Sequence, residues 1–287
     1  DRQIDKYKVL NNELYIPGHD GETWELGNFY KLDGGIWSKN MTIPDAIHVY
    51  DMALFGGQLF AVLGSTNTEK VLTSKDKGQT WSPVDSAVLK DFQPKAMGDR
   101  VFTLFELKGK LYAAKYLFNA KTVVNNLLCM EQVQIDGVDT IKCSIVSSND
   151  MLPSAAKNVY YKIVRTCNFK SDLLYIAGEP DNDHQYIPDA LYYAADINAA
   201  SRITLPDSAA LPIDILDRGD TAYVLSYVKV SDKEYINIVY STDDGRSYSE
   251  LFRFTQDTFA RSFEELNGDF YFGLGCDTDI LPESTGH

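Results

Sequence analysis

The chain has 287 residues, with 27 basic against 41 acidic side chains and a formal net charge of -14. Such a surface repels phosphate backbones, and no basic cluster with interleaved aromatics offsets it, so we expect no nucleic-acid partner. No apolar run approaches the ~18 residues that a membrane-spanning helix needs. The 18 Tyr and 14 Phe residues favour strands, on whose pleated surface flat rings pack well.

One phrase recurs six times: a β-rich stretch, a polar turn, and an apolar-aromatic pair that opens a second strand. Its copies are VLNNELYIPG (9–18), LFGGQLFAVLG (54–64), ELKGKLYAAK (106–115), FKSDLLYIAG (169–178), DRGDTAYVLS (217–226) and ELNGDFYFGLG (265–275). Their aromatic anchors are Tyr15, Phe60, Tyr112, Tyr175, Tyr223 and Tyr271, spaced 45, 52, 63, 48 and 48 residues apart. Four-stranded propeller blades repeat at about this length. The apolar residues alternate or form short blocks between turn residues, which excludes helices.

The sequence therefore predicts an all-β, six-bladed β-propeller of four-stranded antiparallel blades, as a single domain over 1–287. The first blade continues with NFYKLDGGIW (28–37), the third with SIVSSNDM (144–151) and the fourth with LYYAADINAASR (191–202). The third repeat is the longest, and we expect an extra hairpin inserted at about 115–145. The sixth blade has only its first two strands before His287. Five blades with an irregular closure are the alternative.

Two segments share the pattern S-x-D-x-G-x-[TS]-[WY], at 74–81 and 241–248. They resemble the Asp-box, or BNR repeat, of the sialidase superfamily and related propellers. The resemblance implies a structural turn between the two outer strands of a blade, with no catalytic role. In such a turn Asp accepts backbone N–H bonds, Gly supplies a positive φ, and the aromatic packs between sheets. The residues concerned are Ser74, Asp76, Gly78, Trp81, Ser241, Asp243, Gly245 and Tyr248.

The chain has four cysteines, of which Cys129 and Cys143 flank the turn signal Asp136-Gly137. We expect these two to face each other across a strand pair and to form a disulfide. Buried free thiols are the alternative. The chain begins at Asp1 without a signal-like segment, so we expect a mature or trimmed protein, in an extracellular, cell-surface or periplasmic location.

In propellers of this family ligands bind on the face away from the Asp-box turns. Three loops expected on that face, 18–25, 178–184 and 275–279, are rich in carboxylates. Converging acids there can bind sugar hydroxyls or Ca²⁺, the candidate ion, although Asp and Asn also populate turns for backbone reasons. Candidate ligand-binding residues in these loops are Asp20, Glu22, Trp24, Asp181 and Asp277, and candidate metal ligands are Asp181, Asp183, Asp277 and Asp279.

The innermost strands of the second and third blades begin with polar residues. His48 and Arg100 each lie twelve residues before their anchor, so we expect them at the same position in neighbouring blades. Asp51 lies slightly further along. We add these three residues to the candidate ligand-binding set, with a structural hydrogen-bonded pair of Asp51 and His48 as the alternative.

Sialidases hold the sugar carboxylate with three arginines, one of them in an N-terminal Phe/Tyr-Arg-Ile-Pro motif, and use a Tyr–Glu nucleophile pair. The corresponding phrase here, Tyr15-Ile16-Pro17-Gly18, has no arginine. We therefore predict a binding or recognition module, with glycans as the ligand class, no required cofactor and no assigned catalytic residue. A glycoside hydrolase that acts through paired carboxylates and a structural platform for protein assembly are the alternatives.

Overall fold

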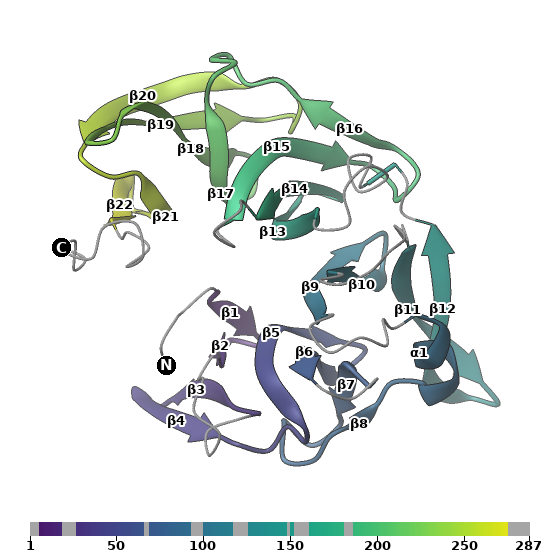
Figure 1. Cartoon of the computed structure of the whole chain (residues 1–287). Coiled ribbons are helices and arrows are strands. Elements are labelled where there is room, and N and C mark those ends of the chain that lie inside the picture. The colour runs from purple at the N-terminus through teal and green to yellow at the C-terminus, as the bar shows by residue number, and fades with distance from the viewer. Residues whose placement is uncertain are drawn as a thin grey trace. The chain divides into compact units, whose positions relative to one another are not determined.

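The computed structural model describes residues 6–18, 27–65, 69–92, 100–116, 126–147, 150–151, 161–180 and 186–274. The chain forms two compact units, Asp1–Lys162 and Ile163–His287. Each unit consists almost wholly of antiparallel strands, in the described part of the chain (Figure 1).

The first unit contains a four-stranded sheet in the order β1-β2-β3-β4 and an eight-stranded sheet that consists of two sets of four. Within the larger sheet β6 joins β9 only where Gly64 pairs with Arg100. The strands are β1 (Lys8–Leu10), β2 (Glu13–Pro17), β3 (Phe29–Asp33), β4 (Ile36–Asn40), β5 (Ala46–Phe55), β6 (Gln58–Ser65), β7 (Val71–Ser74), β8 (Ser82–Pro83), β9 (Arg100–Leu107), β10 (Lys110–Tyr116), β11 (Asn126–Ile135) and β12 (Val138–Ser147).

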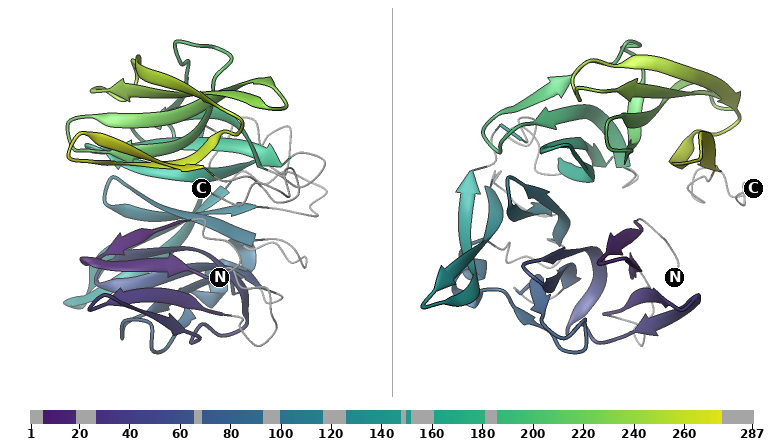
Figure 2. Two further views of the ribbon diagram at one scale, coloured as in Figure 1. Left: turned by 90° about the vertical axis from the view of Figure 1, so that its left-hand side faces the viewer. Right: turned by 180° about the vertical axis from the view of Figure 1, so that it is seen from behind.

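The second unit contains two four-stranded sheets, in the orders β13-β14-β15-β16 and β17-β18-β19-β20, and the two-stranded β21-β22. The β21–β22 hairpin lies beside β17 and β18 (Figures 1 and 2). The strands are β13 (Lys162–Phe169), β14 (Asp172–Pro180), β15 (Tyr186–Ala194), β16 (Ala200–Ile203), β17 (Leu211–Asp217), β18 (Ala222–Ser231), β19 (Glu234–Thr242), β20 (Ser249–Gln256), β21 (Ala260–Leu266) and β22 (Asp269–Leu274).

The repeat phrase marks a hairpin in every case, because each anchor lies in the second strand of a set. Five sets have four strands and the last has two, among the residues that the structure describes. The nearly all-β class and the four-stranded antiparallel sheets agree with the sequence. The six-bladed arrangement stays a prediction.

The anchors differ in burial. Tyr15, Phe60, Tyr112 and Tyr175 are buried, whereas Tyr271 is 55% exposed. In β22 the neighbouring rings Phe270 and Phe272 pack on Phe252 of β20 instead. Since side chains alternate along a strand, these rings direct Tyr271 to the other face. The last repeat therefore keeps the hairpin, but the opposite set of side chains, Phe270 and Phe272, is the half-buried one.

The sequence predicted an extra hairpin inserted at about 115–145. The hairpin at 126–147 is instead a regular part of its sheet. β11 and β12 are the two outer strands of the third set, in the order β9-β10-β11-β12. The only helix in the described residues, α1 (Ser86–Phe92), places Leu89 and Phe92 in the same core as Met130 of this hairpin.

The predicted disulfide is wrong, because Cys129 and Cys143 are free and buried. Asp136 and Gly137 together form the turn, so Cys129 pairs with Ser144, and Cys143 pairs with Met130. Neighbouring positions of a strand point to opposite faces, which separates the two thiols. Burial raises the pKa of Cys143 to about 12. The free thiols also remove the reason for expecting an oxidising compartment.

We predict that Cys129 and Cys143 are both alkylated by iodoacetamide in denaturant without any reductant. Mass spectrometry of tryptic peptides measures this. A peptide pair that is released only after reduction would contradict the pairing register of β11 and β12.

Candidate functional site

The first strand of several sets contains a β-bulge at one repeated position. A separate register shift in β5 skips Ile47, and at the repeated position register shifts leave one residue without a partner in β5, β9, β17 and β21. These bulged residues are Tyr50, Phe102, Ile213 and Arg261, and each lies ten residues before the anchor of its repeat. A bulge re-aims side chains and often lies beside a functional site. Sequence reasoning missed this position, although a polar residue follows it each time: Asp51, Thr103, Asp214 and Ser262.

Asp51 follows the first of these bulges and is fully buried. One carboxylate oxygen lies 2.7 Å from Lys6 Nζ and accepts the Leu104 N–H at 3.0 Å. The other lies 3.1 Å from Lys8 Nζ and accepts the Met52 N–H. Burial opposes ionisation, but the two ammonium groups outweigh it and hold the pKa of Asp51 below its ordinary value. Asp51 therefore ties β1, β5 and β9 together. It is a buried anchor, which agrees with the structural role that the sequence left open for Asp51, but its partners are Lys6 and Lys8 and not His48.

Asp214 repeats this arrangement in the second unit. It accepts the N–H of the next residue, Ile215, at 3.0 Å and the N–H of Phe263 in β21. Among the residues that the structure describes, its counter-charge is a single group, Arg165, whose Nε lies 3.5 Å away. Burial therefore dominates and raises the pKa of Asp214. Both carboxylates accept backbone N–H groups from their own strand and from the next first strand. The number of nearby cations decides whether the pKa of the carboxylate is lowered, as in Asp51, or raised, as in Asp214.

The bulges of β5 and β9 bring two aromatic rings together. The Tyr50 and Phe102 centroids are 5.0 Å apart. His48 lies 5.8 Å from the Tyr50 ring and the Arg100 guanidinium 5.6 Å from it. We call His48, Tyr50, Arg100 and Phe102 the β5–β9 site. Two further cations approach the Phe102 ring, at 4.0 Å for Lys162 and 5.7 Å for Lys6.

Gly64 allows this close packing. It pairs with His48 on one side and with Arg100 on the other, so the structure brings these two predicted site residues to one row. A Cβ atom at Gly64 would lie 2.8 Å from the Tyr50 ring. No side chain fits there without moving that ring.

The other predicted site residues lie outside the described part of the chain. They are Asp20, Glu22, Trp24, Asp181, Asp183, Asp277 and Asp279. Among the residues that are described, no group of three or more His, Cys, Asp or Glu side chains has the geometry to hold a metal ion. Calcium binding stays a prediction about the remaining loops.

The turn at 74–81 has the geometry that its sequence predicts. Asp76 accepts the backbone N–H groups of Gln79 and Thr80 at 3.1 and 2.9 Å and the Thr80 hydroxyl at 2.5 Å. The hydroxyl bond from Thr80, with the bond from its N–H, lowers the pKa of Asp76 to about 2. Gly78 has a φ of 88°. Trp81 is half-buried, and its Nε1 donates to Thr42 Oγ1 at 3.1 Å.

The turn at 241–248 is closed by the same kinds of hydrogen bond, but residues one position later in the pattern make them. Asp244, and not the predicted Asp243, accepts the N–H groups of Arg246 and Ser247, both at 2.7 Å. Thr242 replaces the predicted Ser241, because its hydroxyl bonds to Asp244 and accepts the Gly245 N–H. Thr242 and Gly245 are three residues apart, against four for Ser74 and Gly78 in the first turn. This turn is one residue tighter, which moves the acceptor by one position.

Both turns pack on the preceding sheet. A Cβ atom at Gly78 would lie 2.7 Å from Phe29 of β3, and one at Gly245 would lie 3.0 Å from Tyr193 of β15. Phe29 and Tyr193 occupy third strands of their sheets. Tyr248 is half-buried and donates to the Gly245 carbonyl. The described contacts of both turns are therefore structural.

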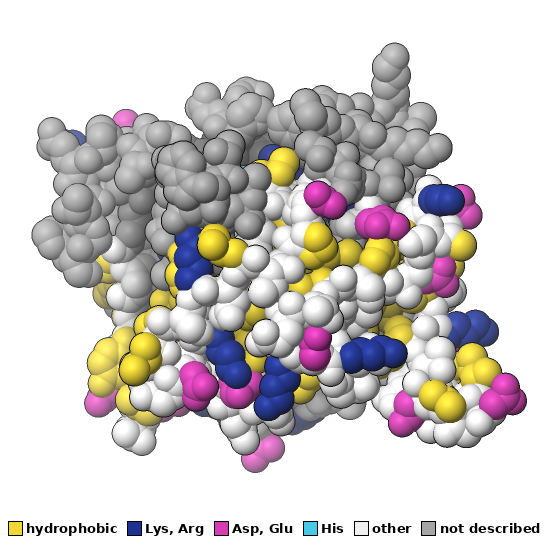
Figure 3. Space-filling view, turned by 90° about the horizontal axis from the view of Figure 1, so that it is seen from below, with side chains coloured by type: hydrophobic (Ala, Val, Ile, Leu, Met, Phe, Trp, Pro, Cys, Tyr) yellow, Lys and Arg dark blue, Asp and Glu magenta, His cyan; other side chains and the backbone are white. Residues whose placement is uncertain are grey.

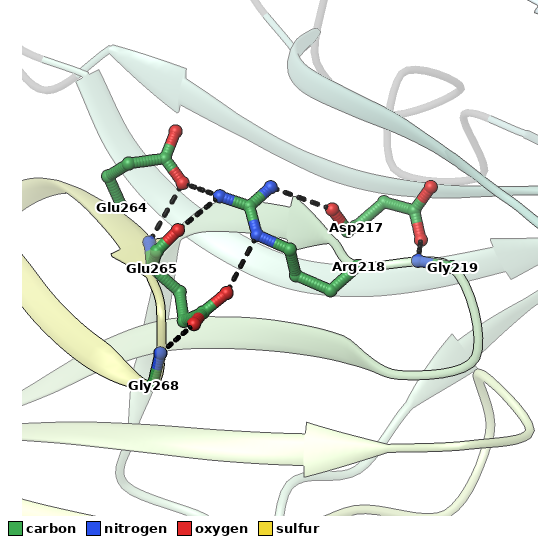
Figure 4. A network of polar contacts seen from close by, with 6 residues as sticks. All are labelled: Asp217, Arg218, Gly219, Glu264, Glu265 and Gly268. Carbon is green, nitrogen blue, oxygen red and sulfur yellow. Dashed lines mark hydrogen bonds and ion pairs between the residues drawn. The ribbon is translucent and has the colours of Figure 1, made fainter.

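A further polar network fastens the last hairpin (Figure 4). Arg218, in the β17–β18 turn, donates to the Glu265 carboxylate at 2.9 Å and to its carbonyl at 2.6 Å, and pairs with Glu264. Glu265 also accepts the N–H of Gly268 in the β21–β22 turn. The network joins two neighbouring hairpin turns.

Basic and acidic side chains are interspersed on the described surface outside these networks. On the face shown in Figure 3, basic and acidic groups alternate with apolar ones and form no patch of a single sign in its described part. No helix in the described residues is long and apolar enough to cross a membrane.

A scan of protein-family models and a search of curated proteins gave no match to this chain. Similar solved structures include a chain of the mitotic checkpoint complex, at 12% identity and TM-score 0.48, covering 91% of this chain and 82% of that one. An exo-β-1,3-galactanase from Phanerochaete chrysosporium, solved with galactose, has 12% identity and TM-score 0.46, with 94% and 66% covered. One from Clostridium thermocellum has 11% identity and TM-score 0.45, with 86% and 60% covered.

The chain thus spans two thirds or less of the length of the two galactanases. At identities of 11% to 12% and TM-scores of 0.45 to 0.48, these similarities carry no inference about what this chain binds. The function has to be argued from the chain's own residues.

We predict that Asp244→Ala lowers the urea midpoint of unfolding, because it leaves two turn N–H groups without their acceptor. Asp243→Ala is the matched control. Lys170 bonds to the backbone carbonyl of Asp243 at 2.6 Å, a contact that alanine keeps. Equal loss in both variants would contradict the register of this turn. Bonds from Ser247 and Arg246 lower the pKa of Asp244 to about 2, so its contribution is present at neutral pH and is lost between about pH 4 and 2.

We predict that Asp51→Ala lowers the free energy of unfolding by about 3–5 kcal/mol at pH 7, because it leaves the Met52 and Leu104 N–H groups without their acceptor and two half-buried ammonium groups without their counter-charge. Urea unfolding followed by tryptophan fluorescence measures this, since all three tryptophans precede residue 163. The folded pKa of Asp51 lies below the unfolded one, so the wild-type advantage is lost as the pH falls through that folded pKa. Asp33→Ala, at an exposed turn, is the control. A pH-independent difference would argue against the charge interaction.

Proposed function

We propose that the repeated sheets build a β-propeller and that the chain is a glycan-binding module whose ligand contacts the β5–β9 site. Three features support the propeller: the repeat length, the four-stranded antiparallel sets, and the bulge at one position of four first strands, β5, β9, β17 and β21. The last set then corresponds to a sixth blade of which two strands are described.

The pair of rings on neighbouring bulges is the observation that carries the binding proposal. Ligand sites combine apolar and aromatic walls with a few placed polar groups. Phe102 is half-buried and supplies a ring, while His48 and Arg100 supply nitrogen donors within one row of the sheet. A sugar presents an apolar ring face and a rim of hydroxyl groups, which matches this combination.

Asp51 gives no support to hydrolysis. A general acid needs a pKa near the working pH and access to the leaving group. Asp51 is fully buried, and its pKa lies below the ordinary value. We therefore propose binding without catalysis by this carboxylate.

We predict that the chain binds at least one member of a panel of neutral and acidic oligosaccharides in isothermal titration calorimetry. Phe102→Ala should weaken that binding at least tenfold, because it removes a ring from the site. Ile213→Ala is the matched control, since Ile213 occupies the equivalent bulge of β17. Thermal unfolding of each variant verifies that it folds. No binding to any panel member at millimolar concentrations, or equal loss in both variants, would overturn the proposal.

A further inference from the structure

The segment Asn40-Met41-Thr42 matches the N-x-[ST] acceptor signal for N-glycosylation, with no proline at its middle position. It is the only match to this signal in the 287 residues. N-linked glycans are bulky and hydrophilic, so an occupied signal has to lie at the surface of the folded protein. The place of these three residues in the first unit therefore decides whether the signal can be used.

Asn40 lies at the edge of the first sheet. It is the last residue of β4, whose outer edge has no partner strand among the described residues. Asn40 is partly exposed, and the neighbouring Met41 is 58% exposed. Within the described chain, the Asn40 amide nitrogen makes two long contacts, both of 3.4 Å, to the carbonyl and hydroxyl oxygens of Ser38. Hydrogen bonds of this length are weak, so substitution of that nitrogen costs the fold little.

Thr42 supplies the hydroxyl group of the signal, and the folded chain uses the same hydroxyl group as a structural contact. It donates to the Gly78 carbonyl at 2.6 Å and accepts the Trp81 Nε1–H at 3.1 Å. These partners follow Thr42 by 36 and 39 residues and belong to the Asp-rich turn at 74–81. The hydroxyl group is therefore accessible to a modifying enzyme only before that turn packs on the first sheet.

We propose that Asn40 is an N-glycosylation site, modified during synthesis before the turn at 74–81 folds onto Thr42. The donor is an oligosaccharide linked to a lipid pyrophosphate. Asn40 Nδ2 forms a bond to the anomeric carbon of the donor, the bond from that carbon to the pyrophosphate oxygen breaks, and the amide nitrogen gives up one proton as the lipid pyrophosphate leaves. Thr42 is synthesised before Gly78, which provides the interval for this transfer. The site is independent of the β5–β9 site.

A glycan at this position protects the sheet edge. An outer strand edge presents backbone groups that can pair with another chain, and bulky hydrophilic groups beside the edge prevent that pairing. A glycan on Asn40 lies at the end of β4 and covers this edge together with the exposed Met41.

The free cysteines are compatible with the oxidising compartment in which this transfer takes place. The thiolate is the form of cysteine that reacts with oxidants. Burial raises the pKa of Cys143 to about 12 and that of Cys167 to about 12. Both thiols therefore stay protonated at neutral pH and resist oxidation.

The test is secretion of the full chain from insect cells, behind a signal peptide that is cleaved on export. We expect the secreted chain to carry a glycan that peptide N-glycosidase removes, and mass spectrometry of tryptic peptides locates it. Asn40→Gln and Met41→Pro should both abolish the glycan, whereas Thr42→Ser, which keeps a hydroxyl group, should retain it. Asn12→Gln, at an exposed turn outside the signal, is the matched control and should leave the glycan in place. Thermal unfolding verifies that each variant folds. A secreted, folded wild-type chain without a glycan at Asn40 would overturn the proposal.

A second measurement tests the order of events. Unmodified chain purified from bacteria is incubated with oligosaccharyltransferase and its lipid-linked donor. We expect the folded wild-type chain to stay unmodified. Gly78→Val should be modified at Asn40, because a side chain at Gly78 collides with Phe29 and separates the turn from the first sheet. Equal modification of both chains would show that Thr42 is accessible in the folded protein and would overturn the proposed timing.

Discussion

A carboxylate placed directly after a β-bulge holds consecutive first strands together in both units. Asp51 joins β5 to β9 through the Leu104 N–H, and Asp214 joins β17 to β21 through the Phe263 N–H. A bulge disrupts the ladder and leaves backbone groups that need a partner. A carboxylate supplies that partner and also fixes the neighbouring strand. The aromatic pair of the β5–β9 site depends on this arrangement, since Tyr50 and Phe102 are the bulged residues themselves.

The two Asp-rich turns connect each sheet to the preceding one. Each turn is closed internally by its own aspartate, and its glycine then lies against an aromatic ring of the preceding sheet. The turn and the packing depend on the same glycine, because a positive φ at Gly78 or Gly245 closes the turn and places the backbone close to the ring. Local hydrogen bonding and packing between sheets are thus coupled through a single residue.

Burial and pairing divide the polar and aromatic residues into structural and exposed groups. Asp51 has two ion pairs and two backbone bonds, so it stabilises the first unit and does not reach solvent. Phe102 and Trp37, in contrast, keep part of their rings accessible at two separate places of that unit.

The sequence by itself determined the hairpins, the all-β class and the acceptor role of Asp76, because turns and alternation depend on neighbouring residues. Pairing register needed the tertiary structure. A two-residue turn moved the partner of Cys129 from the expected Cys143 to Ser144, and a tighter turn moved the acceptor from Asp243 to Asp244. The sequence also left undetermined which face of a strand is buried, because alternation of side chains gives two faces. In β22 packing of Phe270 and Phe272 against Phe252 selects one face and leaves Tyr271 on the other. The bulges were hidden for the same reason: an extra residue is recognised only when the partner strand is known.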